Sequence, residues 1–114
     1  MQRGHRLSRS RDFDAVYRHG RSVSTRYLVL YWFERENGDG EDPRLGVAVP
    51  KKVGGSVIRN RIKRQLREAW ERVSPAPRND YVLVVRPGLP EAAETRGFAW
   101  LEERVGEVLQ KAQL

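Results

Sequence analysis

Residues 51–72, which read KKVGGSVIRNRIKRQLREAWER, combine a helical apolar pattern with a dense run of positive charge. Apolar residues recur at helical spacing, which predicts a helix over residues 57–73 with one side packed on a core. Between residues 51 and 67 there are seven Lys or Arg and no acid, so the remaining surface is positive. A rigid helix with a guanidinium-rich outer face suits a phosphate backbone. The apolar stripe consists of Ile58, Ile62, Leu66, Ala69, Trp70 and Val73.

The start of this helix carries a cation at a place where the helix dipole disfavours one. Ser56 is a good N-cap residue by type, which puts Arg59 in the first turn. A cation in the first turn opposes the dipole. A cation that destabilises the helix at this position indicates a polyanionic partner, although a surface helix tolerates one such residue.

Length and composition limit the class of protein. A chain of 114 residues fits a single domain, residues 1–114, with residues 1–9 as an extended basic arm. The net charge of +7 favours nucleic acid, an anionic membrane surface or an acidic protein as partner. The absence of cysteine excludes disulfides and thiolate metal sites and is compatible with a cytoplasmic location. No apolar run approaches the roughly 18 residues of a membrane span.

The positive charge is concentrated in two segments. Residues 1–26 hold seven Arg and residues 51–72 hold eight Lys or Arg, together 15 of the 22 cations. Acids gather in the loop at 34–42 and near the C-terminus. This distribution indicates a binding side, the alternative being that the basic runs are merely solvated.

The order of predicted elements is α-β-β-α-β-α. A hairpin loop at 36–43 is expected to join the first two strands in antiparallel pairing, and Gly20 is expected to end the first helix as a C′ residue. The basic helix is then the crossover between strands two and three of a small α+β sandwich, with helices packed on a mixed sheet. By default such a crossover is right-handed. The predicted helices are 11–19, 57–73 and a last one that carries Phe98 to Ala112; the predicted strands are 26–33, 44–49 and 80–86.

Catalytic and metal-binding chemistry is poorly supported. His5 and His19 are the only histidines, and nothing in the sequence brings them together as an acid–base pair. The carboxylates show no metal-ligand spacing. We therefore expect no catalytic residue and no metal site in the protein.

Several aromatic residues lie close together along the chain. Phe13 and Tyr17 belong to the first helix, and Tyr27 and Tyr31 belong to the first predicted strand, on the same face as Val29. These rings are either core residues or a stacking surface for single-stranded RNA bases, with arginine at its rim.

The run RNRIKR at 59–64, preceded by KK at 51–52 and followed by Arg67, resembles the signature of the bacterial ribonuclease P protein family. The resemblance covers about residues 5–86. Further matching segments, in order, are RL at 6–7, DF at 12–13, HG at 19–20, the aromatic strand at 27–33 and LGVAVPKK at 45–52.

This resemblance implies an accessory subunit of a ribonucleoprotein endonuclease that removes the 5′ leader of precursor tRNA. A large RNA would carry the active site and its magnesium, and the protein alone would bind no cofactor, membrane or small-molecule substrate. The resemblance also implies a left-handed crossover in place of the default. The residues implied to face the large RNA are Lys51, Lys52, Arg59, Asn60, Arg61, Lys63, Arg64 and Arg67. Those implied to bind the leader are Phe13, Tyr17, Arg26 and Tyr31, and Tyr17 stands where many members have Phe.

Three rival functions use the same sequence features. A structural or ribosomal RNA-binding protein needs the same charge pattern without a processing role. A protein-only nuclease would rely on His5 or His19. Non-specific DNA binding is a weaker third, because dimerising signals such as heptads are missing.

Overall fold

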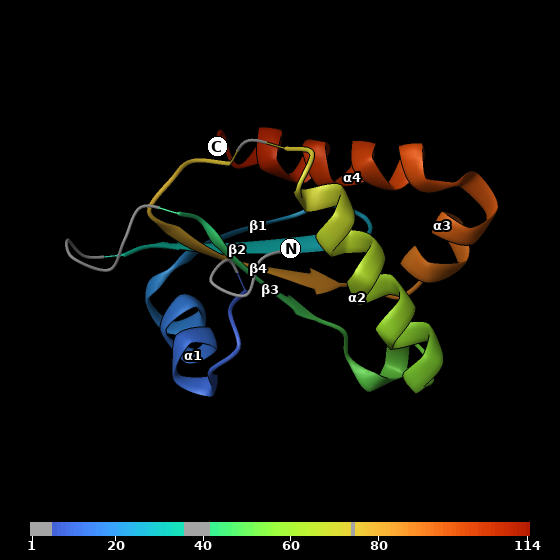
Figure 1. Ribbon diagram of the computed structural model, residues 1–114, viewed down its shortest axis with the longest axis horizontal. Coiled ribbons are helices and arrows are strands. Elements are labelled where there is room, and N and C mark those ends of the chain that lie inside the picture. Colours follow the sequence, from blue (N-terminus) through green and yellow to red (C-terminus); the bar gives the residue numbers. More distant parts are fainter. Residues whose placement is uncertain (1–5, 36–41, 74) are drawn as a thin grey trace.

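Four strands form one mixed sheet in the computed structural model, which describes residues 6–35, 42–73 and 75–114 (Figure 1). The strands lie in the order β1-β2-β4-β3. β2 pairs antiparallel with β1 and with β4, whereas β3 pairs parallel with β4. In chain order the elements are α1 (Ser10–His19), β1 (Arg21–Ser24), β2 (Leu28–Glu34), β3 (Arg44–Ala48), the 3₁₀ turn η2 (Lys51–Val53), α2 (Ser56–Trp70), β4 (Asn79–Val85), α3 (Leu89–Arg96) and α4 (Phe98–Lys111).

The mixed sheet and the helical crossover confirm the predicted fold class. α2 follows β3 and precedes β4, and these two strands are parallel neighbours. A parallel pair requires such a crossover connection. The hand of this crossover stays a prediction.

The predicted antiparallel pairing of the segments 26–33 and 44–49, which correspond to β2 and β3, is wrong. β4 lies between β2 and β3, with Leu83 opposite Leu30 on one side and opposite Val47 on the other. The physical reason is burial: six of the seven residues of β4 are buried, as expected for a central strand covered on both faces. The loop residues 36–41 lie outside the described part of the chain.

Two elements were absent from the predicted order. β1 is a short, mostly exposed edge strand with the sequence RSVS, and the turn that joins it to β2 is closed by a hydrogen bond from Thr25 N to Leu28 O of 2.8 Å. α3 begins in the segment PGLP at 87–90, directly after the third predicted strand. Pro90 sits in the first turn of α3, where its missing N–H costs nothing.

The sheet separates two apolar layers. A larger core lies between one face and the helices α2, α3 and α4, with Leu30, Leu66 and Val105 among its fully buried residues. A smaller cluster lies between the opposite face and α1, around Val16 and Val82. Figure 1 shows α1 and α4 on opposite sides of the sheet.

The ends of the helices differ from the prediction. Gly55, and not Ser56, occupies the N-cap position of α2. Arg9 occupies that of α1, and no side chain caps either helix. Gly20 follows α1 but has an extended backbone with φ −84°. A glycine is required there because a Cβ would overlap the carbonyl oxygens of Val16 and Trp32.

An ion-pair network around Asp80 ties the ends of three strands together. Asp80, on β4, has a side chain only 5% exposed. It accepts hydrogen bonds from Arg35 Nη1, just after β2, at 2.7 Å and from Arg44 Nη2, at the start of β3, at 2.6 Å. The chain ahead of α1 joins the same edge, since Leu7 N donates to Leu45 O at 2.9 Å.

Candidate nucleic-acid interface

The outer surface of α2 presents the cations that the sequence predicted. Ile62 and Leu66 are fully buried on the inner side of the helix. Asn60, Arg61 and Arg64 are exposed. The remaining predicted residues on the helix are half-buried at its flank, namely Arg59, Lys63 and Arg67.

Arg59 is tethered to the loop that precedes the helix. Its Nε donates to the carbonyl oxygen of Gly54 at 3.1 Å. The guanidinium thus gains a partner at the helix start, and its unfavourable position relative to the dipole is partly offset. Arg59 is therefore a weaker argument for a polyanionic partner than the sequence indicated.

Arginines from three segments line a polar hollow beside α1. Its volume is about 420 Å³, and the only acidic group in its lining is Asp12. Arg67, on α2, has a lowered pKa because of burial and then because of the nearby charge of Arg6. The hollow therefore continues the positive surface of α2, and guanidinium forks of this kind suit phosphate oxygens. The arginines of the hollow are Arg6, Arg9, Arg11 and Arg44.

This arginine hollow was not predicted from the sequence. The pairing of Arg6 and Leu7 with Leu45 brings the arm beside β3. Nothing in the local sequence around residue 6 signals a neighbour almost forty positions away. The density of arginine before residue 12 was the one available signal.

The three aromatic rings predicted to bind a single strand do come together. Tyr17, on α1, meets Tyr31, on β2, edge-on at 4.9 Å between ring centroids, and Phe13 lies 6.4 Å from Tyr17. Tyr17 is 41% exposed. Its pKa is raised by burial, then by Tyr31 and by Asp14. Phe13 lies over Gly46 of β3, where any Cβ would overlap its ring.

Arg26 and Tyr27 do not join this aromatic group. The Arg26 guanidinium lies 5.2 Å from the centroid of Tyr27, and Tyr27 packs edge-on against Trp100 of α4 at 5.1 Å. The predicted common face of Tyr27, Val29 and Tyr31 is therefore wrong for Tyr27. Tyr27 precedes the first residue of β2, so the alternation of the strand does not reach it.

A groove of about 840 Å³ extends the aromatic group along the sheet. Its floor includes Val29 and Val84, which are partners in the register and lie on the same face as Tyr31. Ser22, opposite Tyr31 on β1, continues the floor. Cations at the rim come from three separate segments, namely Lys52, Arg86 and Lys111.

The groove includes one residue that was predicted for another surface, and two that were not predicted. Lys52, which the resemblance places among the large-RNA contacts, lines the groove, and its contact with the large RNA stays a prediction. Arg86 comes directly after β4, and its Nη1 donates to Thr25 O at 2.7 Å. This hydrogen bond holds the Arg86 side chain beside the β1–β2 turn. Lys111 comes from the last turn of α4. Neither was predicted, because each is a lone cation in its own segment.

The histidine pair of the nuclease hypothesis gains no support from geometry. The His19 ring lies 6.1 Å from that of Phe33, and His5 is outside the described residues. Within residues 6–35, 42–73 and 75–114, no three His, Cys, Asp or Glu side chains are grouped as a metal site requires. Across the same ranges, none of the helices has the length and apolarity needed to traverse a bilayer.

Comparison with known proteins identifies the family. The sequence model described as Ribonuclease P matches residues 1–113. The ribonuclease P protein component of Brevibacillus brevis is 35% identical over 116 residues, covering 100% of this chain and 87% of the relative. That of Macrococcus caseolyticus is 34% identical over 87 residues, covering 75% and 74%. The solved RNase P protein of Thermotoga maritima superposes with a TM-score of 0.81 at 30% identity, covering 93% of this chain and 96% of that one. This chain therefore belongs to the ribonuclease P protein family.

Proposed function

We propose that the protein binds the large catalytic RNA of ribonuclease P through α2 and the 5′ leader of precursor tRNA through the aromatic group and the groove that extends it. In this role it is the accessory subunit of an endoribonuclease that produces the mature 5′ end of tRNA. The observation that carries the proposal is the separation of α2 from the aromatic rings by one sheet. α2 packs on one face, whereas the aromatic rings lie on the other.

The surface assigned to the large RNA is the outer side of α2 with the arginine hollow. Its cations stand on a helix whose inner side is fixed by buried Ile62 and Leu66, so their positions are set before RNA arrives. Preorganised charges lose little conformational entropy on binding. Contacts of this kind release counterions and depend strongly on salt.

The surface assigned to the leader is the aromatic group together with the groove. Exposed Tyr17 and half-buried Tyr31 offer ring faces to unstacked bases, and a single strand can continue over the apolar floor at Val29 and Val84. The rim cations Lys52 and Arg86 lie where phosphates of such a strand would pass. Aromatic floors with basic rims are the common design for binding single strands without strict sequence preference.

The chemistry of hydrolysis is assigned to the RNA. The described residues group no set of side chains suited to acid–base or metal-assisted cleavage, and the family implies that magnesium is held by the RNA. The protein's contribution is electrostatic: it screens repulsion between two polyanions and adds contacts to the leader.

Reconstitution tests this proposal directly. The purified protein alone should leave precursor tRNA intact, whereas protein and the cognate large RNA together should release the leader at the mature 5′ end. The large RNA alone, at the same magnesium concentration, is the control for the protein's contribution. Cleavage by protein from which RNA has been removed would favour the nuclease hypothesis. Binding without any effect on leader removal would favour a structural RNA-binding protein.

A further inference from the structure

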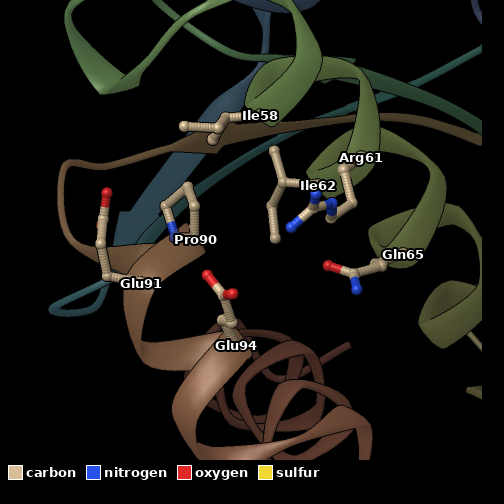
Figure 2. Close-up of a pocket in the computed structure, with 7 residues that line it drawn as sticks. All are labelled: Ile58, Arg61, Ile62, Gln65, Pro90, Glu91 and Glu94. Carbon is tan, nitrogen blue, oxygen red and sulfur yellow. The ribbon is translucent and has the colours of Figure 1, made fainter.

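A pocket of about 100 Å³ lies between α2 and α3, outside the surfaces described above (Figure 2). α2 contributes Arg61 and Gln65 to its lining, and α3 contributes Glu91 and Glu94. Apolar walls are supplied by Ile58, Ile62 and Pro90. The pocket thus opens beside Arg61, one of the cations assigned to RNA.

Three polar groups of different kinds converge on this pocket. Figure 2 shows the carboxylate of Glu94 and the amide of Gln65 turned toward the space between the helices, with the guanidinium of Arg61 at its side. The side chains of these three residues form no hydrogen bond or ion pair with any residue in the described ranges. A donor, an acceptor and an amide that provides both are therefore available to a ligand.

The apolar wall of the pocket is partly open to solvent. Ile58 is 40% exposed, and Val57, next to it in the chain but outside the lining, is 70% exposed. Both lie at the first turn of the helix that carries the RNA-facing cations. A flat ring inserted between Ile58 and Pro90 would cover this apolar surface.

The carboxylate of Glu94 is the most informative feature. A negative charge beside a phosphate-binding helix repels the RNA backbone and lowers non-specific affinity. Such a group can still favour binding if it accepts hydrogen bonds from a base edge. A carboxylate at this place therefore favours bases whose edge presents N–H donors to it.

We propose that this pocket takes one unpaired guanine base of the RNA bound on α2. The Watson–Crick edge of guanine carries two adjacent donors, N1–H and the 2-amino group, and one acceptor, O6. Glu94 can accept from both donors while Arg61 donates to O6, a pairing that fits the charges on the two sides of the pocket. Adenine presents the acceptor N1 toward the carboxylate, and uracil offers a single N–H. The inference rests on the proposed RNA-binding role of α2.

Short oligonucleotides with one variable base test this inference. The probes are UUGUU, UUAUU and UUIUU, in which inosine lacks the 2-amino group of guanine. Binding is followed by NMR of the ¹⁵N-labelled full chain, through the backbone amides of Gln65 and Glu94. We expect UUGUU to bind about tenfold or more tightly than UUAUU, with UUIUU between them.

Two matched variants assign the preference to one carboxylate. Glu94→Gln should abolish the preference for UUGUU and leave the affinity for UUAUU unchanged or higher. Glu103→Gln removes the same charge from α4, outside the lining of the pocket, so it should keep the preference. Circular dichroism verifies that both variants are folded.

The outcomes separate this inference from the proposed function. Equal binding of the three probes, or a preference that survives Glu94→Gln, overturns the guanine pocket. In that case the large RNA still binds the wild type, and the proposed function stands. If the large RNA fails to bind, both are wrong.

Discussion

At the scale of single residues, Asp80 holds three strand ends in place. It is the shared carboxylate between Arg35, whose side chain is 4% exposed, and Arg44. Removing one partner of a buried ion pair leaves an uncompensated charge in the interior, which costs more than the pair itself contributes. Asp80 thereby links β4 to both of its neighbours, β2 and β3, which do not pair with each other.

Asp80→Asn should lower the free energy of unfolding by about 3–5 kcal/mol, measured by urea denaturation. The matched control is Asp12→Asn, which removes a carboxylate 3.9 Å from Arg44 in a more exposed setting. That control should cost less than about 1 kcal/mol. An equal decrease of the unfolding free energy in the two variants would show that the buried ion pairs of Asp80 contribute no more than the exposed one of Asp12.

Gly46→Ala should disturb the aromatic group while leaving the main core intact. A Cβ at this position would lie 2.7 Å from Phe13 Cε1 and 3.2 Å from Leu7 Cβ, so the ring and α1 must shift. Small-to-large changes of this kind cost about 1–3 kcal/mol. NMR should show shifts in α1 and Tyr31 but not in α4, and affinity for precursor tRNA should fall. Unchanged α1 signals would show that the ring rotates aside without consequence.

At the scale of elements, the basic helix and the groove make separable contributions. Arg61→Ala and Arg64→Ala should each weaken assembly with the large RNA. Each lost phosphate contact should flatten the log–log dependence of affinity on salt by about 0.7–0.9. Arg96→Ala, on α3, removes the same charge away from the outer side of α2 and should change the slope little. An unchanged slope in Arg61→Ala and Arg64→Ala would mean that α2 faces another partner.

Phe13→Ala and Tyr31→Ala should weaken binding of precursor tRNA more than binding of mature tRNA. Only the precursor has a leader to stack, and stacking contributes about 1–3 kcal/mol per base by alanine substitution. Tyr27→Ala is the matched control, since that ring packs against Trp100 on the opposite face.

Unfolding measurements must accompany this comparison, because loss of a buried ring can itself cost about 3–5 kcal/mol. Stably folded variants that lose affinity for both tRNAs equally, or for neither, would place Phe13 and Tyr31 in the core alone.

The helices with strong periodicity could be predicted from sequence, and the elements defined by tertiary partners could not. The helical spacing of Ile62 and Leu66 predicts α2, and that of Leu101 and Val105 predicts α4. β1 and α3 carry weak local patterns, since RSVS is short and polar and the second residue of α3 is a proline. The same limit applies to the site: Phe13, Tyr17 and Tyr31 were predicted together, while Arg86 and Lys111 are brought to the groove only by the sheet.

At the scale of the whole molecule, the sheet separates the two surfaces that we propose to bind RNA. α2 packs on one face of the four strands, and the aromatic group of α1 and β2 lies on the other. Two polyanions can therefore be bound at once without sharing a contact surface. The net charge of +7 reduces the repulsion between them.

The central position of β4 has a consequence for synthesis of the protein. β4 is the last strand in the sequence, yet it is the only one that touches both β2 and β3. A nascent chain that has emerged only as far as residue 78 already contains every arginine of α2, but its sheet is still in two unconnected parts. Pairing between distant segments is a late and slow event in folding. The arginines of α2 therefore gain a rigid support only after β4 has been synthesised and has paired with both β2 and β3.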